Sequence, residues 1–155
     1  MPSCFLSCPG YPLPDAAALG RCRDQAGAIA ARRGWNLVEA PSLGRFAGPG
    51  AWPALAHRRS ETLEALRCDV WWCARGGYGC VELAASLLDH PSPRAPLLIG
   101  FSDVTALHAL WQRRGWGETL HAAMPSLAFG PRAAASLEAL AAGRGWSTAA
   151  TDTPG

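Results

Sequence analysis

The sequence predicts an α/β domain with a doubly wound, mostly parallel sheet of about five strands and helices on both faces. Two observations support this fold class. Short apolar runs alternate with segments of helical periodicity, in the order β-α-β-α-β-α-β-α-β-α that is typical of a parallel sheet. The connections are short, which favours right-handed crossovers. A chain of 155 residues fits one such domain.

The first strand–helix–strand unit is marked by its ends. Residues 4–7 form an apolar first strand, and a turn rich in Pro and Gly follows at 8–14. Asp15 is a suitable N-cap for a long helix that ends in two arginines, and Gly34 is a natural stop just beyond it. Residues 35–40 then form a second strand, so the unit opens a parallel sheet.

The remaining elements follow the same alternation. A loop at 41–53 leads to a helix at 54–66, and the third strand is apolar on both faces, as a central parallel strand requires. The expected strands are 69–74, 96–99 and 119–121, and the expected helices are 81–88, 105–114 and 131–142. The tail at 148–155 has no core-forming pattern and is expected to be disordered.

Composition excludes several classes of protein. The net charge is +2 with acids and bases interspersed, so we expect no nucleic-acid partner. No apolar run approaches the ~20 residues of a membrane span, and the N-terminus lacks a signal peptide pattern, so we expect a cytoplasmic protein without a membrane partner. The six cysteines have no C-x-x-C spacing and are expected to be small core residues; we expect no metal and no cofactor.

The stretch from Pro96 to Leu107 is the first candidate for chemistry. A buried strand that runs into a helix through Gly100-Phe101-Ser102 presents the Ser hydroxyl at a sharp turn, as in a nucleophile elbow. Val104 stands where the second elbow glycine would be. The alternative interpretation is that Ser102 only caps the helix.

A glycine-rich loop is the second candidate. Residues 75–79 read Arg-Gly-Gly-Tyr-Gly between a strand and a helix, and glycines there let backbone N–H groups approach a ligand. A tight turn without a ligand explains the loop equally well. However, this loop and Ser102 both follow what should be neighbouring strands, at the carboxyl edge where such sheets carry their sites.

These motifs together resemble the LD-carboxypeptidases, also called muramoyl-tetrapeptide carboxypeptidases. The resemblance runs to about Pro131. It rests on the following segments: Ser7–Tyr11, Arg45–Gly48, Arg75–Gly79, Gly100–Leu107 and Thr119–Met124. Two segments depart from the family pattern. Ala122-Ala123 stands in place of Gly-Pro. Pro49–Pro53 stands in place of acidic and basic residues, so this loop is not expected to anchor the substrate as it does in the family.

The resemblance implies a serine peptidase that releases terminal D-alanine from cytoplasmic murein tetrapeptides. Ser102 would be the nucleophile. The oxyanion hole would use the backbone N–H of Asp103 and that of Gly77, with Gly76 as the alternative donor. Fixed donors beside the attacking oxygen are what a tetrahedral oxyanion requires.

The resemblance also implies a second, C-terminal domain that supplies Glu and His. We therefore interpret residues 1–147 as the nucleophile domain, without that Glu/His domain, and expect little activity from this chain alone. Among its own histidines, His121 ends a strand at the correct edge and is the best internal base, with Glu118 or Asp103 to orient it. His57 and His90 lie elsewhere, and His108 should point away from Ser102.

Other functions remain open at this point. The chain is alternatively a non-catalytic, flavodoxin-like module that binds an anion or a peptide through the glycine loop. It is alternatively a hydrolase of peptide-nucleotide conjugates, like the microcin self-immunity branch of the family. A domain without its partner domain is expected to expose apolar surface near Trp116, Met124 and Leu127, which would favour a homodimer or aggregation.

Overall fold

The computed structural model describes residues 1–46, 52–91, 95–126 and 131–142. Its centre is a five-stranded sheet in the order β2-β1-β3-β4-β5, and every strand pair is parallel. The strands are β1 (Ser3–Ser7), β2 (Asn36–Glu39), β3 (Val70–Cys73), β4 (Leu97–Gly100) and β5 (Thr119–His121). The predicted doubly wound parallel sheet is therefore confirmed.

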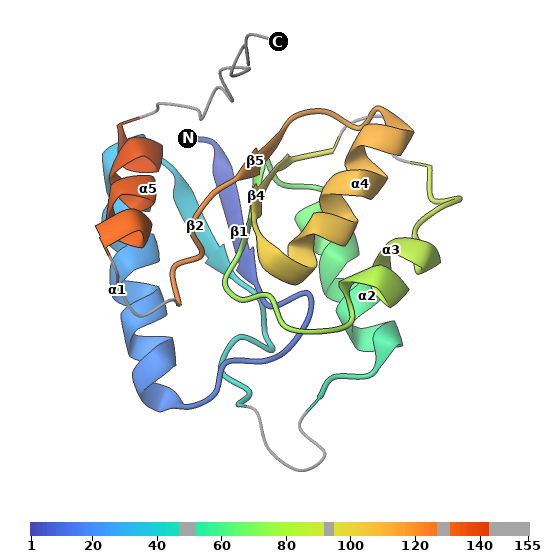
Figure 1. Cartoon of the computed structure of the whole chain (residues 1–155), viewed down its shortest axis with the longest axis horizontal. Coiled ribbons are helices and arrows are strands. Elements are labelled where there is room, and N and C mark those ends of the chain that lie inside the picture. The colour runs from blue at the N-terminus through green and yellow to red at the C-terminus, as the bar shows by residue number, and fades with distance from the viewer. Residues whose placement is uncertain (47–51, 92–94, 127–130, 143–155) are drawn as a thin grey trace, which may run out of the picture.

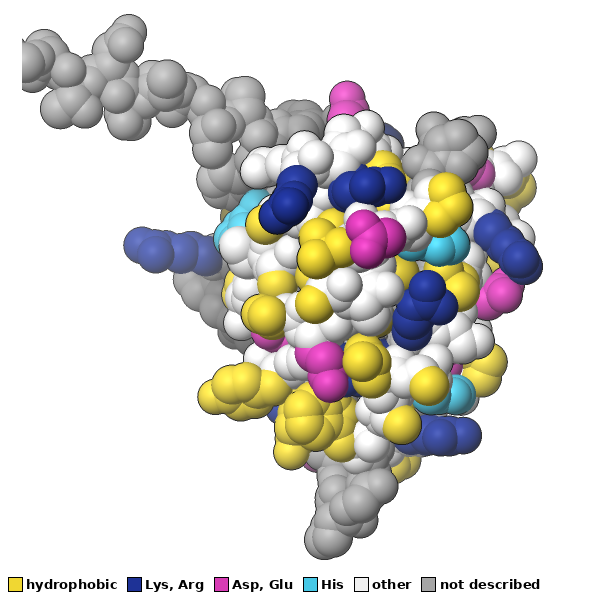
Figure 2. All heavy atoms as spheres, turned by 90° about the vertical axis from the view of Figure 1, so that its right-hand side faces the viewer, with side chains coloured by type: hydrophobic (Ala, Val, Ile, Leu, Met, Phe, Trp, Pro, Cys, Tyr) yellow, Lys and Arg dark blue, Asp and Glu magenta, His cyan; other side chains and the backbone are white. Residues whose placement is uncertain are grey.

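Helices cover both faces of this sheet (Figure 1). The helices are α1 (Ala16–Arg33), α2 (Leu55–Ala65), α3 (Cys80–Ser86), α4 (Thr105–Arg114) and α5 (Pro131–Ala141), with a 3₁₀ turn η1 (Ser102–Val104) before α4. Helices α1 and α5 lie side by side on one face, whereas α2, α3 and α4 lie on the other. The outer surface of the second group mixes hydrophobic, acidic and basic side chains (Figure 2).

The sheet divides the core into two buried clusters. Trp71 and Trp72 are adjacent in β3, so they point to opposite faces, and both are fully buried. Each indole N–H has an acceptor, Ser7 Oγ at 2.8 Å for Trp71 and the Ala123 carbonyl at 3.2 Å for Trp72. The apolar character of both faces of β3, inferred from sequence, is thus confirmed.

The cysteines belong to this core, as expected. Five of the six are buried, Cys68 is half-buried, and all six thiols are free. Burial raises the pKa of Cys4, Cys8 and Cys22 to about 12. Thiols held in this neutral form are packing residues rather than nucleophiles.

Local signals set the element ends correctly. The Asp15 carboxylate accepts a hydrogen bond from the Ala18 N–H at 2.7 Å at the start of α1. Gly34 ends α1 and Gly115 ends α4, both with left-handed backbone (φ 65° and 61°) that favours glycine. Leu127 and the tail at 148–155 lie outside the described residues.

The expectation of an exposed apolar surface near Trp116 and Met124 is wrong. Trp116 is 6% exposed and Met124 is 2% exposed. The Trp116 ring packs edge-on against Trp111, with 5.1 Å between ring centroids, in the cluster beneath α4. These two residues therefore give no reason for self-association.

Within the described ranges, no helix is long and apolar enough to cross a membrane.

Candidate functional site

The candidate site lies at the carboxyl edge of β4. The chain leaves β4 at Gly100, and two residues later Ser102 begins η1 with φ +62°, in the left-handed region. Among the residues that the structure describes, Ser102 is the only non-glycine with positive φ. A serine in this conformation costs about 1–3 kcal/mol, so the surrounding packing has to hold it there.

The helix lies tightly on the strand before this turn. A Cβ atom at Gly100 would lie 3.0 Å from Val104 Cγ1 and 3.1 Å from Cys73 Cβ. Ser102 is exposed, and its side chain forms no hydrogen bond within the described ranges. The cap positions of η1 and α4 are Phe101 and Val104, so Ser102 does not cap the helix and the alternative interpretation is wrong.

The glycine-rich loop at 75–79 lies directly against this turn. A Cβ atom at Gly76 would be 3.2 Å from Ser102 Cβ and 3.4 Å from the backbone nitrogen of Asp103. The lack of a side chain at Gly76 therefore leaves open the space beside the Ser102 side chain and the Asp103 N–H. The loop follows β3, which neighbours β4, as the sequence predicted.

Gly77 is fixed by the turn after β1. Its φ is +111°, and a Cβ atom there would lie 2.4 Å from Tyr11 Cβ. The Tyr11 N–H donates to the Gly76 carbonyl at 3.1 Å. Because the peptide is trans, the Gly77 N–H points to the opposite side, away from Tyr11. Arg75 stabilises the contact, since it donates to the Pro12 carbonyl and lies over the Tyr11 ring.

The Asp103 side chain and backbone have different roles. Its carboxylate accepts from the Cys80 N–H at 3.0 Å, so it satisfies the first turn of α3 and joins α3 to the serine turn. Its own N–H is the second of η1 and has no acceptor within that turn. The carboxylate is therefore engaged with α3 and does not orient His121.

A buried arginine that sequence reasoning missed holds the surrounding loops. The Arg58 side chain on α2 is 2% exposed and pairs with Glu82 at 2.7 Å. It donates to three carbonyls, those of Pro9 (3.3 Å), Pro53 (3.1 Å) and Gly79 (2.9 Å). The guanidinium is thus surrounded by acceptors from the loops that follow β1, β2 and β3, and its bond to the Gly79 carbonyl holds the glycine-rich loop in place.

The histidines do not assemble a base at Ser102. His121 is exposed at the end of β5, level with Gly100, and its ring centroid is 5.8 Å from that of Phe101. His57 lies on α2, with Nε2 3.3 Å from a Glu61 oxygen. Within the described part of the chain, no recorded hydrogen bond joins a histidine to the Ser102 hydroxyl, and no cluster of three metal-ligating side chains occurs.

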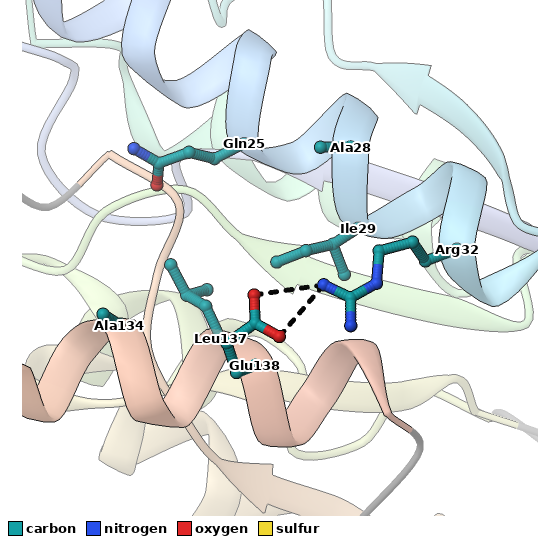
Figure 3. Close-up of a pocket in the computed structure, with 7 residues that line it drawn as sticks. All are labelled: Gln25, Ala28, Ile29, Arg32, Ala134, Leu137 and Glu138. Atoms are coloured by element: carbon teal, nitrogen blue, oxygen red, sulfur yellow. Dashed lines mark hydrogen bonds and ion pairs between the residues drawn. The ribbon is translucent and has the colours of Figure 1, made fainter.

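A separate surface pocket lies far from this turn. It has a volume of about 320 Å³ between α1 and α5, on the opposite face of the sheet from α4. Ile29 and Leu137 line it, and Arg32 pairs with Glu138 across it at 3.1 Å (Figure 3). Its lining includes no member of the serine turn or the glycine loop.

Fold and site together define an α/β domain that presents a strained, exposed serine between a strand and a helix. The model of the LD-carboxypeptidase N-terminal domain matches residues 18–122. The chain therefore belongs to the LD-carboxypeptidase family, as the motifs predicted.

Curated relatives agree with this assignment. A Streptomyces coelicolor protein named "Putative carboxypeptidase SCO6489" is 37% identical over 132 residues, covering 75% of this chain and 38% of that protein. The murein tetrapeptide carboxypeptidase of Pseudomonas aeruginosa is 48% identical over 48 residues, covering 28% of this chain and 15% of that protein. The chain thus spans well under half the length of these relatives.

Solved structures share the fold. The microcin C7 self-immunity protein MccF in complex with aspartyl sulfamoyl adenosine superposes with a TM-score of 0.67 at 16% identity, covering 96% of this chain and 45% of that one. An MccF-like protein from Bacillus anthracis gives a TM-score of 0.62 at 16% identity, covering 81% and 38%.

Proposed function

We propose that this chain carries the nucleophile and oxyanion hole of a serine carboxypeptidase that releases terminal D-alanine from murein tetrapeptides. The Ser102 hydroxyl attacks the carbonyl carbon of the last peptide bond and gives its proton to a base. D-Alanine leaves with a proton on its amine, and water then hydrolyses the acyl-serine ester.

One observation supports this proposal above the others: the strained, exposed Ser102 lies against Gly76, and among the described residues two backbone N–H groups of this turn and the adjoining loop have no acceptor. Those are the N–H of Asp103 and that of Gly77, with the N–H of Gly76 as the alternative to the second. Preorganised donors stabilise the negative charge that develops on the carbonyl oxygen, and each is worth about 3–4 kcal/mol. The N-terminus of η1 and α4 adds a favourable dipole.

The base is proposed to come from outside the described residues. The Asp103 carboxylate is held by Cys80, and His121 has no carboxylate partner among its recorded contacts. A Ser hydroxyl without a base is a weak nucleophile. We therefore propose that a Glu/His pair of a further domain completes the site, and that residues 1–147 alone hydrolyse tetrapeptide poorly.

The family and the named relatives support the proposed substrate. The Pseudomonas relative is named a murein tetrapeptide carboxypeptidase, which favours a peptide ending in D-alanine. We propose a cytoplasmic location, where free thiols stay reduced. Two of the MccF structures are complexes with aminoacyl sulfamoyl nucleosides, so a peptide-nucleotide conjugate is the second candidate substrate.

The test joins this chain to the remaining portion of the Streptomyces relative and measures D-alanine release. We expect release by the chimera, little by the chain alone, and loss in Ser102→Ala. Ser60→Ala, an exposed serine on α2, is the matched control and should keep activity. D-Alanine release that persists in the Ser102→Ala chimera refutes the proposal that Ser102 is the nucleophile. Strong, Ser102-dependent D-alanine release by the chain alone refutes the proposal that the base lies in a further domain. If the chimera cleaves an aspartyl-nucleotide conjugate but not the tetrapeptide, the second candidate substrate is favoured over the first.

A further inference from the structure

A buried histidine contacts the strand end that presents Ser102. His108 lies on α4, is 7% exposed, and places Nε2 3.0 Å from the carbonyl oxygen of Gly100. The same carbonyl accepts the Ala122 N–H at 3.3 Å. Gly100 is the last residue of β4, two residues before Ser102, so the side chain ties the helix after the turn to the strand before it.

The tautomer of His108 follows from its partners. A carbonyl oxygen only accepts hydrogen bonds, so Nε2 carries the proton. Nδ1 is buried and has no partner within the described residues, so a proton there would be unsatisfied. The ring is therefore neutral, with a bare Nδ1. This arrangement also removes His108 from the list of candidate bases, because its one lone pair is enclosed and its N–H is committed.

The charges around the ring favour the same state. Burial lowers the pKa of His108 below its ordinary value of 6.5; the hydrogen bond to Gly100 opposes part of this shift, and the nearby His121 adds a smaller lowering. His121 on β5 faces it, with 6.1 Å between ring centroids. The carboxylates on adjoining elements are engaged elsewhere, that of Asp103 with Cys80 and that of Glu82 with Arg58.

We propose that neutral His108 is a positioning residue for the serine turn. By donating to the Gly100 carbonyl it fixes the plane of the Gly100–Phe101 peptide, which is the last planar unit before the Phe101–Ser102 peptide. Ser102 has an unfavourable φ, and such a conformation persists only when its surroundings over-determine it. The catalytic meaning of this role rests on the proposed function of Ser102, but the structural claim does not.

The wild-type chain tests this inference without substitution. Nitrogen-15 NMR of the imidazole should show the proton on Nε2 and none on Nδ1. As the pH falls below 6.5, protonation of His108 should place an unsatisfied N–H at the buried Nδ1 and displace the ring from Gly100. The backbone amide signals of Ser102 and Asp103 should therefore shift with the same midpoint as the His108 ring signals. A proton on Nδ1, or turn signals that ignore the His108 titration, overturns the proposal.

Variants separate positioning from general stability. His108→Gln retains an N–H donor and should keep the wild-type turn signals while losing their pH step. His108→Leu removes the donor and should shift the turn signals at every pH. In the chimera with the remaining portion of the Streptomyces relative, which supplies the proposed base, it should slow phosphonylation of Ser102 by a fluorophosphonate about tenfold. His90→Gln, in the loop after α3, is the matched control and should change neither.

The outcomes remain distinguishable from failure of the proposed function. If Ser102 of the otherwise wild-type chimera is not phosphonylated at all, the nucleophile proposal fails, but the amide signals still decide the role of His108. Turn signals and labelling rates that are equal in His108→Leu and wild type overturn the positioning role. If His108→Leu does not fold, the wild-type titration and His108→Gln decide it.

Discussion

The substitution Gly76→Ala places one methyl group where the proposed oxyanion would lie. The backbone tolerates alanine there, since Gly76 is not among the glycines with positive φ. The added Cβ would be 3.2 Å from Ser102 Cβ and 3.4 Å from the Asp103 nitrogen, tighter than ordinary contact by a few tenths of an ångström. The expected cost to folding is about 1 kcal/mol, partly offset by the reduced entropy of the unfolded chain.

The effect on chemistry should be far larger. The methyl group blocks the approach of an oxygen to the Asp103 N–H, and loss of one such donor lowers the rate about 10²–10³-fold, or about 3–4 kcal/mol. The assay is the rate of Ser102 phosphonylation in the chimera that supplies the proposed base, followed by intact-mass spectrometry. The phosphonyl oxygen occupies the oxyanion position in this reaction. Thermal unfolding of the same samples reports the stability change.

Two other glycines serve as controls. Gly20→Ala lies in α1, where an added Cβ meets nothing within 4 Å, so it should stabilise the chain by about 0.5–1 kcal/mol and leave labelling unchanged. Gly77→Ala combines positive φ with a 2.4 Å clash against Tyr11 Cβ and should disrupt the fold itself. A folded Gly76→Ala chimera that is labelled as fast as the wild-type chimera would refute the reasoning.

Further expected outcomes concern stability and reactivity. Ser102→Gly should relieve the strain at φ +62° and raise Tm by about 2–4 °C in a thermal scan, and an unchanged or lower Tm would argue against strain. Arg58→Met should destabilise by about 3–5 kcal/mol in urea because it leaves buried acceptors unpaired, whereas the exposed Arg67→Ala should cost at most about 0.5 kcal/mol. Iodoacetamide should modify Cys68 first and the five buried cysteines only on unfolding, and early modification of a buried thiol would contradict the packing. Burial lowers the pKa of His108 in the folded chain below 6.5, so protonation of His108 favours the unfolded chain. The free energy of unfolding in urea should therefore decrease as the pH drops below 6.5, and it should decrease more in wild type than in His108→Gln. An equal decrease in the two proteins would disprove this.

Much of the fold could be predicted because local signals agree with the global pattern. Asp15 and Gly34 set the ends of α1 through capping chemistry that depends only on neighbouring residues. Ser102 could be placed at the carboxyl edge because it follows an apolar run that ends on Gly100. Its positive φ could not be predicted, since serine adopts that conformation only when distant residues such as Gly76 leave it room.

The residues that sequence reasoning missed are those whose partners are set by the tertiary fold rather than by a local sequence pattern. Arg58 sits in a polar stretch of α2, and nothing local shows that three connections place carbonyls around it. His108 was expected to point away from Ser102; it does not contact that hydroxyl, but its bond to Gly100 was not foreseen. The surface near Trp116 was expected to be exposed because a partner domain was expected to cover it, but the Trp111 ring of α4 packs against Trp116 within this domain. Buried polar and aromatic side chains therefore needed the tertiary structure.

The most direct test of the account is to identify the residue that a fluorophosphonate modifies in the native chimera, in which the remaining portion of the Streptomyces relative supplies the proposed base. We expect one adduct, mapped by peptide mass spectrometry to Ser102, absent in Ser102→Ala and absent after unfolding. Native Ser60→Ala should be labelled as wild type is. An adduct on any other residue, or a folded chimera that gives none, would contradict the claim that this strained serine beside Gly76 and the Asp103 N–H is a nucleophile.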